Sequence, residues 1–272
     1  MHFATSLVVA AALAEPAAPP EALSVEPAQS RSIYALHPIA DAALIAGGTV
    51  ASIIPNLFAK QLIHPRCPCD RAEVNALDRS TIGDASAFAN DLSDVTVLVA
   101  LAAPVAFDVL DLGLGAQKEL FEDAVVYSEV MAIDTALVSV TKVIVQRPLP
   151  LVYAMQSPGL IDSPNGYRSF YSGHTTTVVA ALSAGAMNYT LRHGDSAWNR
   201  TWPWLTTALV GGSVAVERVL AGRHFITDVV VGAAVGATVG TLVPFFHSRG
   251  APGRIGIAPS EGGAMLSWTL RN

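Results

Sequence analysis

The stretch FITDVVVGAAVGATVGTLVPFF, residues 225–246, is apolar over its whole length and carries a single charge, Asp228. A helix that crosses a lipid bilayer needs about 20 mostly apolar residues, so this segment is long enough to span. Its Gly232, Gly236 and Gly240 recur at every fourth position and form a stripe of small residues on one helix face. Such a stripe allows a second helix to pack closely against it. The segment therefore predicts a membrane-spanning helix in close contact with a neighbour.

Five further apolar segments precede it, at roughly residues 39–59, 92–112, 120–146, 174–191 and 202–221. They are too long for strands, and Gly, Pro, Asn and Asp interrupt the chain between them. We therefore predict an all-α fold, a bundle of about six apolar helices embedded in a membrane. Charged residues make up only 14% of the chain, against about 25% in an average soluble domain. The net charge of -6 offers no broad basic face, which excludes nucleic acid as a partner.

The third apolar segment carries four acidic residues, Glu122, Asp123, Glu129 and Asp134. Charges inside a membrane are costly unless they face the interior of the helix bundle. Two explanations stay open at this point. Either the acidic face is shielded from lipid by the other helices, or the whole bundle is a soluble periplasmic protein.

Three short clusters hold polar residues at the ends of the apolar segments. They are Lys142-Val-Ile-Val-Gln-Arg147-Pro148-Leu149-Pro150, Ser169-Phe-Tyr171-Ser172-Gly173-His174-Thr175, and Arg218-Val-Leu-Ala-Gly-Arg223-His224-Phe-Ile-Thr-Asp228. In an antiparallel bundle, the end of the third helix meets the start of the fourth. The end of the fifth helix meets the start of the sixth on that same side. Connectivity alone therefore brings all three clusters to one face.

The residue types in these clusters suit a tetrahedral oxyanion such as phosphate. Lys142, Arg147 and Arg218 supply positive charge and many N–H donors. Ser172 and Gly173 begin a helix, where free backbone N–H groups and the helix dipole attract anions. Because Gly173 has no side chain, its backbone can approach a ligand closely.

Two histidines add the means for chemistry. His224 and Asp228 are four residues apart and share a helix face, so the carboxylate can hold one ring nitrogen and leave the other as a nucleophile. His174 can protonate the leaving oxygen as a general acid. Each residue alone has an ordinary structural explanation, such as Lys142 facing a helix dipole or Arg218 pairing with Asp228. Their convergence on one face favours the functional interpretation.

The three clusters resemble the signature of the type 2 phosphatidic acid phosphatase and vanadium haloperoxidase superfamily. That signature runs Lys-x6-Arg-Pro, then Pro-Ser-Gly-His, then Ser-Arg-x5-His-x3-Asp. The second cluster is similar as Tyr171-Ser172-Gly173-His174, and the third as Glu217-Arg218, five residues, His224, three residues and Asp228. The resemblance covers roughly residues 85–246, and six helices is the membrane architecture of that family.

The first cluster departs from the family pattern. Counting from Lys142, the family arginine should fall at Leu149, whereas Arg147 stands two residues early. On a regular helix a spacing of five residues swings a side chain by about 140° away from the lysine face. The prolines that follow can end the helix and let Arg147 turn inward. Arg168 and Arg223 are other candidates to replace the missing arginine.

The resemblance implies a metal-independent phosphatase without a cofactor, in which His224 attacks phosphorus and a phosphohistidine forms. Asp228 steadies the charge on His224, and His174 protonates the departing alcohol. The phosphate-binding residues implied are Lys142, Arg147, Ser172, Gly173 and Arg218. The expected substrate is a lipid phosphate, either phosphatidic acid, phosphatidylglycerol phosphate or undecaprenyl pyrophosphate, while a soluble bundle favours small phosphomonoesters.

Two other functions stay open. A haloperoxidase uses the same residues to hold vanadate, and the chain is short for the larger soluble haloperoxidases of the family. A non-catalytic relative that binds membrane phospholipid is the second alternative, supported by Leu149 and opposed by the presence of both histidines and Asp228.

The chain divides into four parts. Residues 1–14 read as a secretory signal segment, since an apolar stretch ends in Ala12-Leu13-Ala14, and residues 15–38, rich in Ala, Pro and Glu, read as a linker. Residues 39–246 form the phosphatase domain, and residues 247–272 form an extended or hairpin tail. We expect a bacterial cell membrane with the site facing the periplasm. That orientation requires that the signal is not cleaved or that 39–59 does not cross, because a cleaved signal and six spans place the site loops in the cytoplasm.

The two cysteines, Cys67 and Cys69, lie in Cys-Pro-Cys spacing. Two ligands do not make a zinc site, and His64 is the nearest further candidate. The sequence leaves two interpretations, a loop disulfide in an oxidising compartment or two free thiols.

Overall fold

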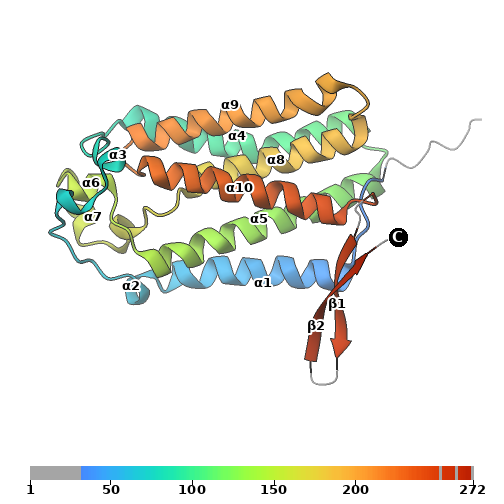
Figure 1. Cartoon of the computed structure of the whole chain (residues 1–272), viewed down its shortest axis with the longest axis horizontal. Coiled ribbons are helices and arrows are strands. Elements are labelled where there is room, and N and C mark those ends of the chain that lie inside the picture. Colours follow the sequence, from blue (N-terminus) through green and yellow to red (C-terminus); the bar gives the residue numbers. More distant parts are fainter. Residues whose placement is uncertain (1–31, 251–252, 261–262, 271–272) are drawn as a thin grey trace, which may run out of the picture. The chain divides into compact units, whose positions relative to one another are not determined.

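The computed structural model describes residues 32–250, 253–260 and 263–270, so the predicted signal segment lies outside the described residues. Six long helices run along the described chain, and they confirm the prediction of an all-α bundle (Figure 1). They are α1 (Pro38–Leu57), α4 (Ala87–Leu112), α5 (Gln117–Val145), α8 (Gly173–His193), α9 (Ala197–Leu220) and α10 (Ile226–His247). Long apolar runs interrupted by turn residues were therefore a sufficient guide to the main elements.

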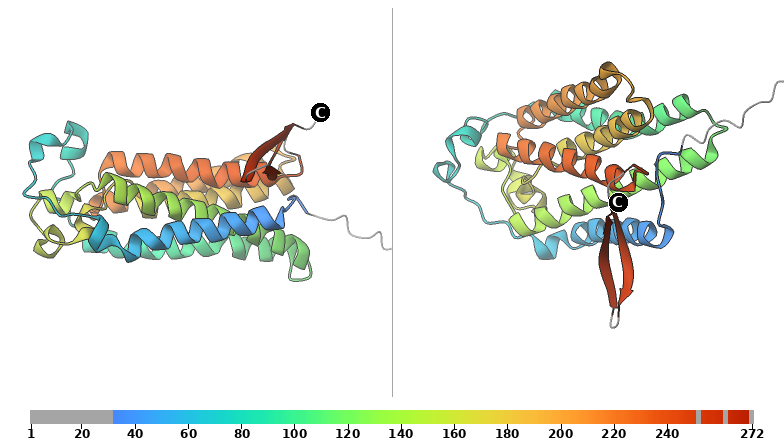
Figure 2. Two further views of the ribbon diagram at one scale, coloured as in Figure 1. Left: turned by 90° about the horizontal axis from the view of Figure 1, so that it is seen from below. Right: turned by 45° about the vertical axis from the view of Figure 1, so that its right-hand side comes forward.

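Short elements gather at one end of the bundle, where α5 ends and α8 and α10 begin (Figure 1). They are α2 (Ala59–Leu62), the 3-10 turn η1 (Arg71–Glu73), α3 (Ala76–Arg79), α6 (Pro150–Tyr153), α7 (Pro158–Ile161) and the 3-10 turn η2 (Pro164–Tyr167). Figure 2 shows from two further sides that the long helices run side by side while these elements cover that end. The end of the bundle is thus built from loops that bring polar residues together.

Helices α8 and α10 pack with their backbones almost in contact. A Cβ atom added to Gly232 would lie 2.8 Å from the carbonyl oxygen of Ser172, and one added to Gly236 would lie 2.3 Å from that of Thr176. Gly240 approaches Ala180 in the same way, at 2.3 Å. The glycine stripe therefore does what small residues do in membrane helix pairs, and it fixes the start of α8 beside the start of α10.

Three helices of the described chain, α1, α4 and α10, are long and apolar enough to cross a membrane, which indicates a membrane protein. The acidic residues of α5 face the bundle interior: Glu122, Asp123, Glu129 and Asp134 are all buried. Asp123 accepts hydrogen bonds from Arg192 at 2.5 and 2.6 Å. The acidic side chains of the third apolar segment are thus buried by the other helices, as the first of the two explanations requires.

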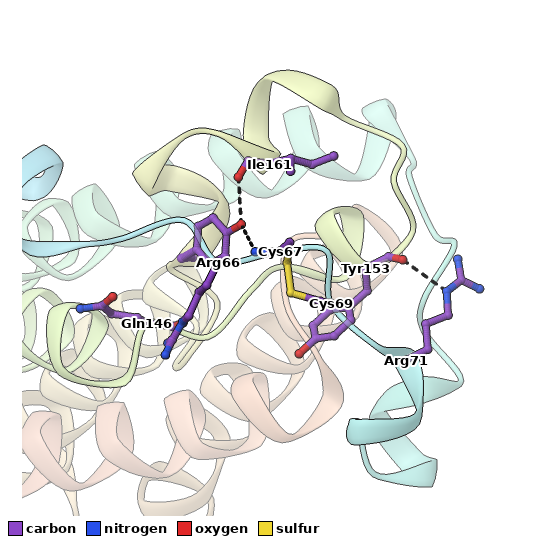
Figure 3. The surroundings of a disulfide bond; sticks show 8 residues. Arg66, Cys67, Cys69, Arg71, Gln146, Tyr153 and Ile161 are labelled. Atoms are coloured by element: carbon purple, nitrogen blue, oxygen red, sulfur yellow. Dashed lines mark hydrogen bonds between the residues drawn. A yellow bond between two sulfur atoms is a disulfide. The ribbon is translucent and has the colours of Figure 1, made fainter.

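A disulfide joins Cys67 to Cys69, in the loop between α2 and η1 (Figure 3). The backbone N–H of Cys67 donates to the Tyr167 hydroxyl at 3.1 Å, and that hydroxyl donates to the Ile161 carbonyl at 2.9 Å. Arg66 donates to the Gln146 carbonyl at 2.8 Å. These bonds tie the disulfide loop to the loops that follow α5, at the end of the bundle that holds the short elements.

The tail forms the hairpin expected from its composition. Strand β1 (Gly253–Ser260) pairs antiparallel with β2 (Gly263–Leu270), in a register that sets Gly253 opposite Leu270.

Candidate active site

A cavity of about 320 Å³ opens where the short elements meet the helix ends. The residues that line it are Lys142, Leu149, Asn165, Arg168, Gly173, His174, Arg218, Arg223 and His224. Four of these are Lys or Arg, and none of the described lining residues is a carboxylate. The cavity is therefore built for an anion, and it contains five of the eight predicted site residues, from all three sequence clusters.

The turn between α9 and α10 positions the third cluster. Gly222 adopts a left-handed conformation, with φ +64, and a Cβ there would lie 2.1 Å from the Asp84 carbonyl oxygen. Only glycine fits both the conformation and the space. The backbone N–H groups of Arg223 and His224 then both donate to the Arg218 carbonyl, at 3.2 and 3.3 Å. This tight turn sets the side chains of Arg218, Arg223 and His224 around one cavity.

His224 is buried, and one of its ring nitrogens is committed to the backbone. Its Nδ1 lies 2.7 Å from the carbonyl oxygen of Ser169. Because a carbonyl only accepts, Nδ1 carries the hydrogen and Nε2 keeps a free lone pair. Burial lowers the pKa of His224 to about 3. The imidazole is therefore neutral near pH 7, which is the state that a nucleophile requires.

Asp228 lies behind His224 rather than in direct contact with it. The Nδ1 atom of His224 is 3.9 Å from the nearer Asp228 carboxylate oxygen, which is too long for a hydrogen bond. That oxygen instead accepts from the Ser169 hydroxyl at 2.5 Å and from the Phe225 backbone N–H at 3.0 Å. Asp228 thus places a negative charge near the ring, while Ser169 takes the hydrogen-bonding role that the sequence assigned to Asp228.

His174 stands at the start of α8 and faces a carboxylate that the sequence did not single out. Its Nε2 lies 2.6 Å from Asp94 of α4. Asp94 belongs to an apolar segment and no motif marks it, so only the packing of α4 beside α8 reveals the pair.

Arg218 is held in place by residues of α4. Its Nη1 donates to the Ser93 hydroxyl at 2.9 Å and to the Asn90 side chain at 3.2 Å. Its Nε is buried and has no hydrogen-bond partner among the described residues. A buried N–H group without a partner is costly, so this donor is available to an anion in the cavity.

The first two clusters contribute Lys142 and Gly173 to the cavity. The Lys142 Nζ donates to the carbonyl of Arg168 at 2.5 Å and lies close to Gly173, whose added Cβ would meet the lysine Cε at 3.9 Å. Ser172 is buried but does not line the cavity. Its hydroxyl oxygen accepts from the Thr175 N–H at 3.4 Å, so this side chain caps α8 and leaves the backbone of Gly173 to face the site.

The structure places Arg147 away from the cavity, which differs from the phosphate-binding role predicted for it. Its guanidinium donates to Asp228 at 2.5 Å and to Asp78 at 2.8 Å, and it lies 4.1 Å from the centre of the Phe225 ring. The reason is local: α5 ends at Val145, and Gln146 adopts a left-handed conformation that turns the chain away from the helix axis. Arg147 therefore supports the site from behind.

Arg168 and Arg223, the two substitutes suggested by the sequence, do line the cavity. Burial lowers the pKa of the Arg168 guanidinium, which stays charged at neutral pH because its ordinary value is so high. Leu149 also lines the cavity and is buried. The position where the family pattern expects an arginine is thus a cavity position, filled here by an apolar side chain between cations from other elements.

Comparison with known proteins shows what part of this chain is similar to. Residues 123–250 match the PAP2 superfamily. The crystal structure of Aquifex aeolicus LpxE is similar with a TM-score of 0.40 and 24% sequence identity, over 61% of this chain and 92% of that chain. A search of curated proteins found no match.

Proposed function

We propose that this protein, whose residues 123–250 match the PAP2 superfamily, is a metal-independent phosphatase that acts on a lipid phosphate through a phosphohistidine at His224. One observation carries the proposal. His224 lines a cavity surrounded by four cationic side chains, and its Nε2 is the ring nitrogen left free by the bond to Ser169.

In the first step, Nε2 of His224 attacks phosphorus and the bond from phosphorus to the leaving oxygen breaks. The ring gains positive charge as the P–N bond forms, and the Asp228 carboxylate at 3.9 Å stabilises that charge. The side chains of Lys142, Arg168, Arg218 and Arg223 neutralise the phosphoryl oxygens. Phosphoryl transfer depends mainly on such positioning and charge stabilisation, so these side chains can supply it without a metal or another cofactor.

His174 gives a proton to the leaving oxygen. Burial and the nearby Arg218 hold the pKa of His174 below its ordinary value. The Asp94 carboxylate, 2.6 Å from Nε2 of His174, opposes that shift by favouring the protonated imidazole that a general acid needs. In the second step, water attacks the phosphohistidine, the P–N bond breaks and inorganic phosphate leaves. His174 then accepts the proton from that water, which restores both histidines.

A membrane lipid is the substrate class that best suits the position of the cavity. The cavity lies at the ends of the helices, and α10, which begins beside it, is apolar enough to cross a membrane. A site at the end of a spanning helix lies at the depth of lipid head groups. Phosphatidic acid, phosphatidylglycerol phosphate and undecaprenyl pyrophosphate each present a phosphate at that depth.

The disulfide supports a periplasmic orientation of the site in a bacterial membrane. Disulfides persist in oxidising compartments such as the periplasm and are rare in the cytosol. The Cys67–Cys69 bond lies in the loop held by Tyr167, at the same end of the bundle as the cavity. A cavity and a disulfide on the same face therefore favour a site outside the cytoplasm.

The test is phosphate release by protein purified in mild detergent with EDTA present. We expect release from at least one of the three lipids, and trapping of a phosphorylated protein in acid-quench experiments with labelled substrate. The H224A variant should lose both signals, while H193A, which removes a histidine near the other end of α8, should keep them. Full activity in H224A would refute the phosphohistidine mechanism. Lipid binding without release of phosphate would favour a non-catalytic role.

A further inference from the structure

Helix α1 buries almost nothing except one carboxylate. Of its 20 residues, only Asp41 is fully buried, and most of its apolar side chains are exposed. A buried charge is expensive unless it is paired, so Asp41 needs a partner of opposite charge. Among the described residues it forms an ion pair with neither Lys nor Arg. Its Oδ2 accepts from the His37 backbone N–H at 2.7 Å, while its Oδ1 lies 3.5 Å from His247 and a second carboxylate lies close by.

The second carboxylate is Glu129, in the middle of α5. Its side chain is fully buried, and neither of its oxygens has a hydrogen-bond partner among the described residues. Native proteins satisfy nearly all buried polar atoms, so two unpartnered oxygens on one buried carboxylate indicate a missing positive partner. One oxygen of Glu129, one oxygen of Asp41 and one ring nitrogen of His247 all lie within 4.8 Å of one another.

His247 presents a free nitrogen to both carboxylates. Its Nδ1 lies 2.9 Å from the Val243 carbonyl oxygen, so Nδ1 carries the hydrogen. Its Nε2 lies 3.3 Å from Glu129 and 3.5 Å from Asp41. A histidine that binds a metal commonly donates its other N–H to a backbone carbonyl, and His247 shows that arrangement.

The two separations from Nε2 of His247, 3.3 and 3.5 Å, match the edges of a metal coordination shell. With bonds of about 2.1 Å to nitrogen and oxygen, neighbouring ligands of a tetrahedral ion lie about 3.4 Å apart. A protonated histidine that bridged the two carboxylates would instead bring N and O to about 2.7–2.9 Å. It would also leave one negative charge uncompensated, whereas a divalent ion cancels both.

We propose that Asp41, Glu129 and His247 form a buried site for one divalent transition-metal ion that clamps α1 to α5 and α10. One imidazole nitrogen with two carboxylates suits Zn²⁺ or a similar ion better than Mg²⁺ or Ca²⁺, which prefer oxygen ligands alone. Water completes the coordination. Figure 1 shows α1 beginning and α10 ending at the end of the bundle opposite to α6 and α7.

The clamp is separate from the phosphate cavity. Asp228 and His247 are at opposite ends of α10, about 28 Å apart at 1.5 Å per residue. The ion therefore holds the helices together and takes no part in phosphate release. This distinguishes it from the proposed chemistry, which continues in EDTA.

The experiment is metal analysis of the full chain in detergent. Protein stripped with EDTA, incubated with Zn²⁺ and desalted should retain one ion per chain, and Co²⁺ in its place should give the visible absorption of a tetrahedral nitrogen and oxygen site. At free Zn²⁺ about 100-fold above its Kd, the Tm should rise by about 5–10 °C. Wild-type protein that retains no Zn²⁺ and shows no Tm change would overturn the proposal without any variant.

Variants then assign the ligands. E129Q and D41N should lose the retained Zn²⁺ and the Zn²⁺-dependent rise in Tm. D134N is the matched control, because Asp134 is a buried carboxylate of the same helix that accepts from Thr176 and Thr177 at 2.7 and 2.9 Å. D134N should keep one ion per chain even if its Tm falls. Equal Zn²⁺ retention in E129Q and in wild type would refute the assignment.

Discussion

Replacing Arg147 by alanine distinguishes a supporting role from a phosphate-binding role. In the structure its guanidinium joins Asp78 and Asp228, whose side chains are 0% exposed, while its own side chain is 20% exposed. Removing one partner of a buried ion pair costs about 3–5 kcal/mol, because the remaining charge is left uncompensated. We therefore expect R147A to lose stability even though it contacts no substrate.

The magnitude falls at the lower end of that range. Asp78 keeps hydrogen bonds from Thr227 at 2.6 and 3.0 Å, and Asp228 keeps those from Ser169 and Phe225. A loss of about 3 kcal/mol remains, which corresponds to a fall in Tm of about 6–12 °C for a chain of this size. Lysine cannot reach both carboxylates with a planar fork, so R147K should fall between wild type and R147A.

The difference between R147A and wild type should shrink in acid. Burial alone raises the pKa of the Asp78 carboxyl, but hydrogen bonds from Thr227 and Arg147 outweigh it and hold the pKa below its ordinary value. A carboxyl with a lowered folded-state pKa contributes stability above its unfolded pKa of about 3.9. That contribution is lost as pH falls through the lower folded value, so the Tm gap should narrow below about pH 4.

The assay pairs thermal unfolding in detergent with phosphate-release kinetics, and R168A is the matched control. Arg168 lines the cavity, so R168A should keep its Tm within about 2 °C while kcat/KM falls by about 10- to 100-fold, the worth of one charged hydrogen bond. If R147A instead kept the wild-type Tm and lost as much kcat/KM as R168A, Arg147 would be a phosphate ligand and the supporting role would be wrong.

Three further outcomes follow from single contacts. D94N should lower kcat for a lipid with an alkoxide leaving group by about 10²-fold. Its kcat for p-nitrophenyl phosphate should stay unchanged, because a good leaving group needs little protonation by His174. Equal losses of kcat on both substrates would argue against His174 as the general acid. G236A should lower the free energy of unfolding by about 1–3 kcal/mol, because the added methyl group would clash with α8. G212A should leave it unchanged, because a Cβ atom at Gly212 has no neighbour within 4 Å. Equal Tm values for the two variants would contradict the close packing. In ¹⁵N NMR, Nε2 of His224 should stay unprotonated from about pH 8 to about pH 5, and a titration near pH 6.5 would refute the assigned neutral state.

The long helices and the convergence of the three clusters could be read from the sequence. Apolar length alone located all six helices, and connectivity alone placed Lys142, His174 and His224 on one face. Both depend on local chemistry, since a run of apolar residues must be helical in lipid to satisfy its backbone groups. The glycine stripe of α10 could also be predicted from the sequence, because the spacing of the glycines determines which helix face carries only small residues.

The supporting residues could not be read in the same way. Asp94 and Asp78 contribute through tertiary contacts, with sequence separations of 80 from His174 and 69 from Arg147. No spacing rule links such positions. The role of Ser169 was hidden for another reason: the atom that orients His224 is its backbone carbonyl, and any residue type supplies one.

Arg147 shows why a helical wheel fails at a helix end. The 140° rotation expected between Lys142 and Arg147 applies only while the helix continues, and α5 ends two residues before Arg147. Beyond Gln146 the direction of each side chain depends on the loop. The loop aims Arg147 at two buried carboxylates and brings Leu149 to the cavity wall.

The proposed phosphate site should tolerate this exchange, because an anion is recognised by the positive charges and hydrogen-bond donors around it and not by the helix or loop that supplies them. The cavity draws Lys142 from α5, Arg168 from the loop before α8, Arg218 from α9 and Arg223 from the turn before α10. With four cations from four segments, the apolar side chain of Leu149 removes one donor position and leaves the cavity strongly positive. In the proposed mechanism, the residues that cannot be exchanged are those with a defined atom to place: Nε2 of His224 for attack and the proton that His174 gives to the leaving oxygen. Both are fixed by bonds from outside the cavity, to Ser169 and to Asp94. Variation in the cationic residues should therefore tune affinity, while a shift of the Ser169 backbone carbonyl or a change of the Asp94 side chain should change the rate of the chemical step.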